Sequence, residues 1–198
     1  GAAAISALSG RKNINLFILH PHNKISKIQR KIMTTIGGKN IYNIAINGSF
    51  DDCQKIVKQM FADNLFRQTI NMSGVNSINW ARIIFQIVYY FYSFLRMNYK
   101  KINFSVPTGN FGDIYAGYMA KKMGLPIEKL IVATNENDIL QRVINKGIYK
   151  PTKVKSSLSP SMDIQISSNF ERLLFYVLKS KDFEVKKLMN NLEIKGYF

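Results

Sequence analysis

Two periods of apolar and polar positions alternate along the first third of the chain and predict strands and helices in turn. Residues 15–19 form a short apolar run that ends at a His-Pro pair, which is typical of a buried strand. Residues 26–35 place apolar side chains at helical spacing behind Ser26, a favourable N-cap, and stop before two glycines. Residues 41–46 then read as a second strand.

A second helix is expected to open at Phe50, where Asp51 or Asp52 suits the positive N-terminal end of a helix. Its apolar residues at helical spacing, which we expect to be buried, are Ile56, Val57, Met60 and Phe61. The order strand, helix, strand, helix is the signature of a parallel sheet covered by helices.

The second half repeats this order after a long apolar helix. Residues 63–72 resemble a linker, and a helix from about 78 to 95 is apolar nearly all round, which predicts burial between two layers. The elements predicted after it are strand 102–106, helix 113–123, strand 130–133, helix 138–145, a long loop 149–168 and helix 169–179, with Asn169 as N-cap. We therefore expect two α/β domains, residues 1–65 and 66–198.

The composition of the 198-residue chain is that of a globular protein, with 46% hydrophobic and 20% charged residues. Its apolar runs are shorter than the roughly 20 residues that a membrane span needs, and no signal peptide is visible, so we expect a cytoplasmic protein and no membrane partner. The formal net charge of +16 invites a nucleic-acid hypothesis, but the lysines are scattered instead of clustered. No nucleic-acid partner is expected, although a basic binding module stays an alternative.

Metal-ligating residues are sparse in the sequence. Cys53 is the single cysteine and is expected on the apolar face of a helix. His20 and His22 have no cysteine or carboxylate partner at ligand spacing. We therefore expect neither a disulfide nor a metal site.

The stretch with the clearest chemical signal is Thr108–Asp113, which lies between a predicted parallel strand and a helix. In open α/β sheets, ligands bind at this carboxyl end of the strands. Glycines let the backbone approach a ligand closely, and the free N–H groups of a helix start attract anions. The loop is neither a Walker A motif nor Gly-x-Gly-x-x-Gly. A phosphate site and a simple tight turn explain it about equally well.

Several long blocks in this order resemble the threonine synthases, which are fold-type II pyridoxal 5'-phosphate enzymes related to tryptophan synthase β. The blocks are VPTGNFGDIYAGYMAKKMGLP, LIVATNENDIL, PHNKISKIQRKIMTTIGG, NGSFDDCQKIVKQ, NSINWARIIFQIVYYF and SPSMDIQISSNFERLLF. GAAAISAL resembles the family's Ser-Gly-Asp-Thr-Gly-Ala-Ala helix entry without its first four residues. The resemblance runs from residue 1 to about 174. It implies three-layer αβα parallel-sheet halves of the fold-type II architecture, incomplete at both ends.

In the family this glycine loop holds the phosphate of pyridoxal 5'-phosphate through its backbone amides. The resemblance carries that role to Gly109, Asn110, Phe111 and Gly112, with Asp113 at the helix start and Thr108 as a candidate hydroxyl donor. The family's Schiff-base lysine lies upstream of the Gly-Ala-Ala helix, and no lysine here matches its position. The resemblance therefore implies that this chain alone binds the cofactor poorly and catalyses nothing.

The reaction implied for the whole enzyme is the conversion of O-phosphohomoserine and water to L-threonine and phosphate, the last step of threonine biosynthesis. A phospho-lyase on the same fold is the alternative. The oligomeric state, monomer or homodimer, stays open.

The substrate carries a phosphate of its own, and the polar block 76–82 is a candidate to bind it. Capping by Asn76 or Ser77 explains part of this block. The functional hypothesis adds Asn79 and a phosphate fork from Arg82, with Lys24 as a second cation. The polar run 135–138 follows a strand in the same way, and helix capping explains it nearly as well.

Overall fold

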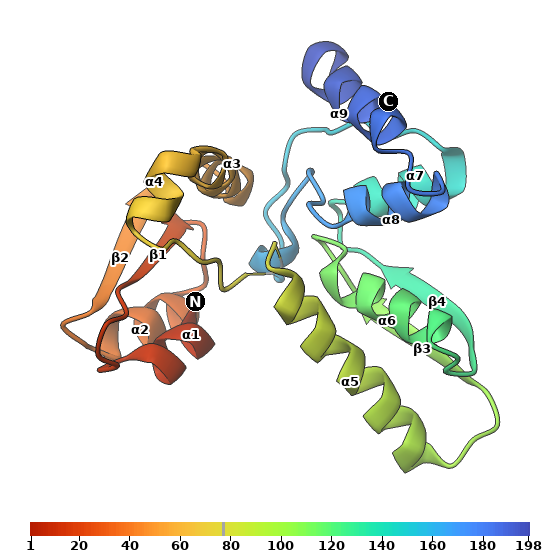
Figure 1. Ribbon diagram of the computed structural model, residues 1–198, viewed down its shortest axis with the longest axis horizontal. Helices are drawn as coiled ribbons and strands as arrows, with labels where there is room; N and C mark the ends of the chain where they lie inside the picture. Colours follow the sequence, from red (N-terminus) through yellow and green to blue (C-terminus); the bar gives the residue numbers. More distant parts are fainter. Residues whose placement is uncertain (77) are drawn as a thin grey trace. The chain divides into compact units, whose positions relative to one another are not determined.

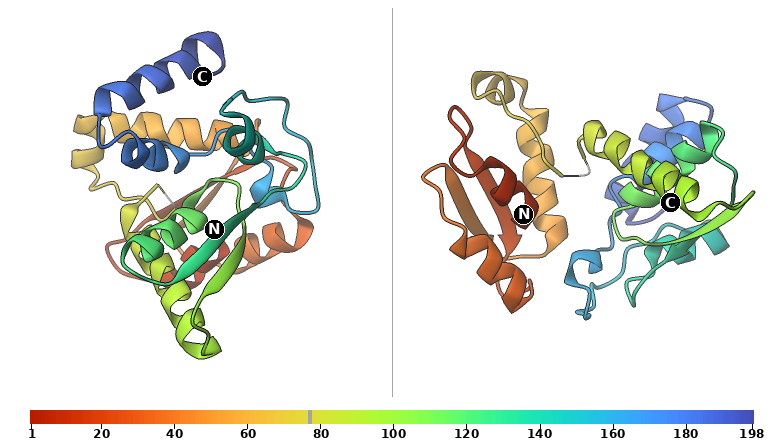
Figure 2. Two further views of the ribbon diagram at one scale, coloured as in Figure 1. Left: turned by 90° about the vertical axis from the view of Figure 1, so that its right-hand side faces the viewer. Right: turned by 90° about the horizontal axis from the view of Figure 1, so that it is seen from below.

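The computed structural model describes residues 1–76 and 78–198, which form two compact units, unit 1 (residues 1–73) and unit 2 (residues 74–198) (Figure 1). Each unit contains a two-stranded parallel sheet, β1-β2 in unit 1 and β3-β4 in unit 2. Helices of the same unit lie against each pair of strands (Figure 2). The predicted α/β fold with parallel strands is confirmed.

Unit 1 consists of α1 (Ala2–Leu8), β1 (Leu16–Pro21), α2 (Lys27–Thr35), β2 (Ile41–Ile46), α3 (Phe50–Ala62) and α4 (Asn64–Thr69). Strand β1 pairs with β2 from Leu16↔Ile41 to Pro21↔Ile46. The N-caps follow the sequence: Ser26 Oγ accepts a hydrogen bond from the Gln29 amide at 3.1 Å, and Ser49 forms a capping box with Asp52. These local signals explain why both helices start where the sequence predicts.

Two predictions for unit 1 are wrong. Residues 63–72 are not a linker, because Asp63 Oδ1 accepts a hydrogen bond from the Phe66 amide at 2.9 Å and starts α4. The four apolar residues of α3 expected in the core are only half-buried. The buried residue of this helix is Cys53, which lies on the apolar face as predicted.

Unit 2 consists of α5 (Trp80–Met97), β3 (Ile102–Pro107), α6 (Gly112–Lys122), β4 (Ile127–Ala133), α7 (Ile139–Lys146), the 3-10 turn η1 (Pro160–Met162), α8 (Phe170–Val177) and α9 (Asp182–Lys195). Its core contains the larger of the two buried clusters, centred on the faces of α5, α6 and α7. Helix α9 has no counterpart among the predicted elements.

The sequence predicts that helix α5 is buried between two layers, and this is wrong. Helix α5 lies beside α6 (Figure 1). Its residues Ile83 and Tyr90 are buried, whereas Phe85 and Leu95 are 70% and 74% exposed. The two helices approach each other closely at Gly117 of α6, where an added Cβ would lie only 2.6 Å from Tyr90 Cε1. Packing against α6 thus decides which side of α5 is buried, although the helix is apolar nearly all round.

Within residues 1–76 and 78–198, no helix has the length and apolarity to cross a bilayer.

Candidate functional site

The glycine loop lies at the carboxyl end of β3, and α6 begins at Gly112. The Thr108 amide donates to the Ala133 carbonyl at 2.9 Å, which fastens the loop to the end of β4. Phe111 is buried and adopts a left-handed conformation with φ of 64°. Its ring meets that of Phe170 edge to face at 5.4 Å between centroids. Left-handed backbone is uncommon outside glycine, so the aromatic contact helps to hold an unusual turn directly before the helix.

The start of α6 carries backbone N–H groups that have no acceptor within the helix. The first intrahelical bond of this turn runs from the Tyr115 amide to the Phe111 carbonyl at 3.1 Å. The Gly112 amide donates to Asn110 Oδ1 at 2.9 Å, so the loop already satisfies one of the amides assigned to the cofactor phosphate. Together with the helix dipole, the remaining donors favour an anion at this place.

Two features of the loop fit a bound phosphate group. A Cβ on Gly109 would lie 3.1 Å from Met162 Cα and 3.2 Å from side-chain atoms of Ile164, so the loop leaves little space for a side chain there. The Thr108 hydroxyl is buried and has no hydrogen-bond partner among the described residues. Buried hydroxyls are almost always paired, so an oxygen-rich ligand would complete this one.

Asp113 lies in the first turn of α6, half-buried beside α5. The Tyr90 hydroxyl donates to the Asp113 carbonyl at 2.8 Å and contacts the carboxylate at 3.4 Å. Burial raises the pKa of Asp113, and the Tyr90 hydrogen bond and the nearby Arg82 charge lower it by less. Burial also raises the pKa of Tyr90, so the Tyr90 hydroxyl keeps its proton and stays the donor of this hydrogen bond.

Replacing Asp113 with asparagine should change the pH dependence of stability. A carboxyl whose pKa is raised by folding stabilises the protein fully below its unfolded value, 3.8 here, and loses that contribution as the pH rises through the folded pKa. We expect the free energy of unfolding of Asp113→Asn, relative to the unsubstituted chain, to rise as the pH increases from 3.8 through the higher pKa of the folded state.

Urea unfolding at a series of pH values measures this difference. Asp182→Asn is the control. Its difference in the free energy of unfolding should change with pH in the opposite direction, because Lys186 lowers the pKa of that exposed carboxyl. A difference for Asp113→Asn that falls with pH would contradict the assignment.

A second polar segment, residues 167–169, packs directly on the loop. The Asn169 amide donates to the Asn110 carbonyl at 3.0 Å. The side chains of Ser167, Ser168 and Asn169 have buried polar atoms with no partner among the described residues. Asn169 is the N-cap residue of α8, as predicted, but its side chain makes no capping bond and is fully buried. The sequence gives no sign of this burial, because Asn is a common N-cap.

Asp163 organises the polar residues that follow β4. Its Oδ1 accepts hydrogen bonds from Asn135 Nδ2 at 2.8 Å, from Asn137 Nδ2 at 3.1 Å and from Ser157 Oγ at 2.6 Å. Its Oδ2 accepts from the Ser157 amide at 2.9 Å. This buried carboxylate joins the β4–α7 turn to the long loop before α8. Sequence reasoning missed it, since a single Asp in a Ser-rich loop looks exposed.

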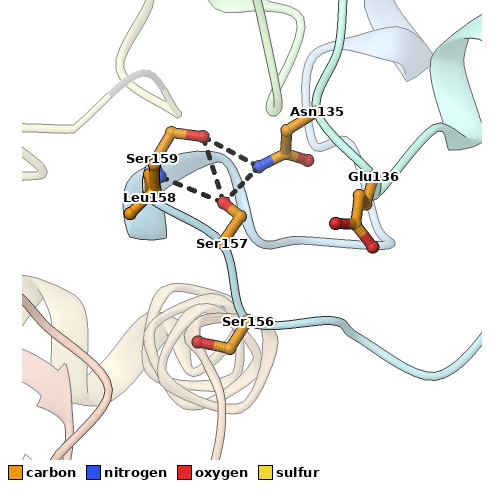
Figure 3. Close-up of a pocket in the computed structure, with 6 residues that line it drawn as sticks. All are labelled: Asn135, Glu136, Ser156, Ser157, Leu158 and Ser159. Carbon is orange, nitrogen blue, oxygen red and sulfur yellow. Dashed lines mark hydrogen bonds between the residues drawn. The ribbon is translucent and has the colours of Figure 1, made fainter.

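Beside this network lies an open pocket of about 630 Å³, lined by Asn135, Glu136, Ser156, Ser157, Leu158 and Ser159. The Asn135 amide lies between the hydroxyls of Ser157 and Ser159, at 2.8 and 2.9 Å (Figure 3). The polar run at 135–138 does not cap α7 through a side chain, because its N-cap residue Asp138 makes no such bond. Its first two residues, Asn135 and Glu136, line the pocket instead.

The candidate residues for the substrate phosphate lie in two different units. Asn79 is the N-cap of α5: its Oδ1 accepts from the Ala81 amide at 3.0 Å and its Nδ2 donates to the Gly74 carbonyl at 2.7 Å. This corrects the predicted cap at Asn76, whose Oδ1 accepts from the Ile78 amide at 3.1 Å. Arg82 is exposed and donates to the Val75 carbonyl at 3.3 Å.

Ser77, the other predicted cap and ligand, lies outside the described residues. Lys24 is exposed and belongs to unit 1, whereas the other candidates belong to unit 2. Within residues 1–76 and 78–198, no group of three or more His, Cys, Asp or Glu side chains is arranged to hold a metal ion.

No protein-family model matches the chain. Curated proteins do match it: it is 52% identical to the threonine synthase of Pseudomonas aeruginosa over 198 residues, which cover 99% of this chain and 42% of that protein. It is also 52% identical to the threonine synthase of Saccharomyces cerevisiae over 201 residues, covering 96% and 39%. The chain thus spans about two fifths of the length of these relatives.

Solved structures agree with this result. A pyridoxal-phosphate-bound threonine synthase from Brucella melitensis superposes on the whole chain with a TM-score of 0.84 at 52% identity, and the match covers 43% of that protein. Threonine synthase from Escherichia coli superposes on 89% of the chain with a TM-score of 0.82 at 38% identity, covering 42% of that protein. The resemblance and the fold class inferred from the sequence blocks are confirmed.

Proposed function

We propose that this chain, which is homologous along its whole length to threonine synthases, supplies the cofactor-phosphate site of an enzyme that makes L-threonine. The full-length reaction would convert O-phosphohomoserine and water to L-threonine and phosphate. The observation that carries the proposal is the loop of Thr108–Gly112. It combines a buried hydroxyl without a partner, a glycine packed against backbone and the start of α6.

Pyridoxal 5'-phosphate, when bound, would act as an electron sink that stabilises negative charge next to the amino group of the substrate. The contribution of this chain is binding and orientation. The amides from Gly109 to Phe111 and those of the first turn of α6 would hold the cofactor phosphate, and the Thr108 hydroxyl would donate to one of its oxygens. A phosphate held by several fixed donors cannot rotate freely, so the ring attached to it is oriented as well.

The substrate phosphate would bind at the N-terminus of α5. Asn79 caps this helix, and Arg82 stands about one turn further along it. A helix start with a nearby guanidinium attracts a phosphate group through both the dipole and the charge. Asn76 completes the proposed set of substrate contacts at this helix start. Ser77 and Lys24 stay candidates that rest on the sequence alone.

We assign residues 1–65 to the remainder of a small domain and residues 66–198 to part of the cofactor-binding domain. The Schiff-base lysine, which would carry out the proton transfers, would be supplied by sequence outside this chain. The full-length enzyme would be a carbon-oxygen lyase acting on phosphates. A cytoplasmic location remains a prediction from the sequence. A phospho-lyase on the same fold would release ketobutyrate from O-phosphohomoserine, so product analysis separates it from threonine synthase.

Binding of pyridoxine 5'-phosphate tests the cofactor site without any need for catalysis. This probe has no aldehyde, so it cannot form a Schiff base with the many surface lysines. Its phosphorus resonance should shift and broaden on titration with the chain. Thr108→Val, which exchanges the hydroxyl for a methyl group of similar size, should weaken binding about tenfold, because a hydrogen bond to a charged phosphate is lost.

Two comparisons make this result specific. Thr108→Val should not lower the free energy of unfolding of the ligand-free chain, since the buried hydroxyl that it removes has no partner there. Thr152→Val, at an exposed threonine, should leave binding unchanged. Equal affinities for both variants and the unsubstituted chain would reject the proposed role of this loop.

A further inference from the structure

Arg172 contacts both residues that flank the N-cap of α5. It lies in the first turn of α8, and its Nη2 donates to the Ile78 carbonyl at 2.6 Å. Its Cζ stands 5.2 Å from the centre of the Trp80 ring, which is cation–π distance. Asn79 lies between these two contacts in sequence. Arg172 therefore holds the turn that starts α5 on both sides of its cap.

The position of Arg172 is not explained by the stability of its own helix. A cation in the first turn of a helix is opposed by the helix dipole. The side chain is half-buried, and burial lowers its pKa while Tyr115 and Glu171 raise it. Among the described residues, no carboxylate lies within ion-pair distance of its guanidinium. The contacts that account for its placement are those to α5.

The same contacts connect α5 with the helix that follows the cofactor loop. The Trp80 ring meets Tyr115 of α6 at 6.1 Å between centroids, with the ring planes at 61°. Tyr115 lies at the end of the first turn of α6, directly behind the loop of Thr108–Gly112. A continuous set of packed side chains thus runs from α8 through the start of α5 to the start of α6.

We propose that Arg172 is a positioning residue for substrate phosphate, which fixes the start of α5 relative to the start of α6. This rests on the proposed function, which places the substrate phosphate at Asn79 and Arg82. Residues 74–76, 78 and 79 belong to no helix or strand. A turn already fixed by Arg172 binds a phosphate without a further ordering cost, whereas a loose turn must be ordered by the ligand itself.

Trp80 gives a direct readout, because it is the only tryptophan in the chain. Its emission would be followed while the 198-residue chain is titrated with O-phospho-L-homoserine. Arg172→Gln should raise the half-saturation concentration about tenfold, as expected for the loss of a charged hydrogen bond. The emission change at saturation should persist, because the residues that bind the phosphate remain.

The matched control is Arg96→Gln, which removes the same charge from the exposed last turn of α5. It should leave the half-saturation concentration within about twofold, because a distant surface charge is screened by salt. Arg172→Lys keeps the charge but has no planar fork for the Ile78 carbonyl and no flat face for Trp80. It should therefore bind almost as weakly as Arg172→Gln. Full recovery with lysine would overturn the positioning role, since charge alone would then suffice.

Arg82→Ala separates this inference from the function on which it rests. No saturable emission change in the unsubstituted chain, or one that Arg82→Ala leaves intact, would reject the proposed substrate site and the role of Arg172 with it. A response that Arg82→Ala abolishes but Arg172→Gln leaves unchanged would keep the substrate site and reject the role of Arg172 alone. Circular dichroism of each variant shows whether the fold is retained.

Discussion

Replacing Asp163 with alanine is expected to lower the free energy of unfolding of unit 2 by about 3–4 kcal/mol, because a buried hydrogen-bond network loses its central acceptor. The carboxylate is buried and accepts four hydrogen bonds, three of them from side chains. Its removal leaves the amides of Asn135 and Asn137 and both donors of Ser157 without this acceptor. Unpaired buried donors cost more than the net gain of the bonds themselves.

Urea unfolding followed by the emission of Trp80 measures this effect, since Trp80 belongs to unit 2. The control is Asp182→Ala, at an exposed carboxylate whose contact is Lys186 at 3.1 Å; it should change stability by less than about 0.5 kcal/mol. If both variants lose the same small amount, the Asp163 network contributes little. Hydrogen exchange at the Ser157 amide should accelerate in Asp163→Ala, because that amide donates to Asp163 Oδ2.

Replacing Gly117 with valine should destabilise unit 2 by about 3 kcal/mol, the upper end of what overpacking of a core usually costs. Glycine in the middle of a helix normally costs up to about 1 kcal/mol relative to alanine, so helix propensity alone predicts a gain. The close contact between α5 and α6 turns this expected gain in stability into a loss. A Cβ at this position would lie 2.6 Å from Tyr90 Cε1 and 3.0 Å from Leu130 Cδ2.

Tyr90 cannot swing aside without cost, because its hydroxyl donates to the Asp113 carbonyl at 2.8 Å and its ring packs on Phe104. The matched substitution is Gly37→Val, where a Cβ has no neighbour within 4 Å and the backbone is not left-handed. It should alter stability by at most about 0.5 kcal/mol in urea unfolding followed by circular dichroism. A Gly117→Val protein as stable as Gly37→Val would show that α5 and α6 are not held at this distance.

Local signals explain the parts of the fold that were predicted from the sequence. The side chains of Ser26 and Asp52 accept hydrogen bonds from backbone amides three residues away. The two-residue and 3.6-residue periods mark strands and helices along the chain itself. The glycine loop of Thr108–Gly112 was recognisable for the same reason, since strand, glycines and helix start follow one another directly. The resemblance of whole blocks then indicated which anion such a loop binds in related enzymes.

Contacts between residues far apart in the chain could not be predicted from such local signals. Arg172 contacts Ile78 across 94 positions, and Asp163 contacts Asn135 across 28. The exposed side of α5 has the same origin, because packing against α6 selects which of its residues turn inward.

The sequence by itself therefore determined the alternation of strands and helices, their parallel pairing, the place of the glycine loop and the family to which its blocks point. The tertiary structure alone decided which polar groups are buried around that loop, among them Thr108, Asp163 and Asn169. The physical reason is that a polar side chain can serve equally well as a cap, in a solvent-exposed turn or in a buried network. The hydrogen-bond partners and burial that select one of these roles come from residues distant in sequence.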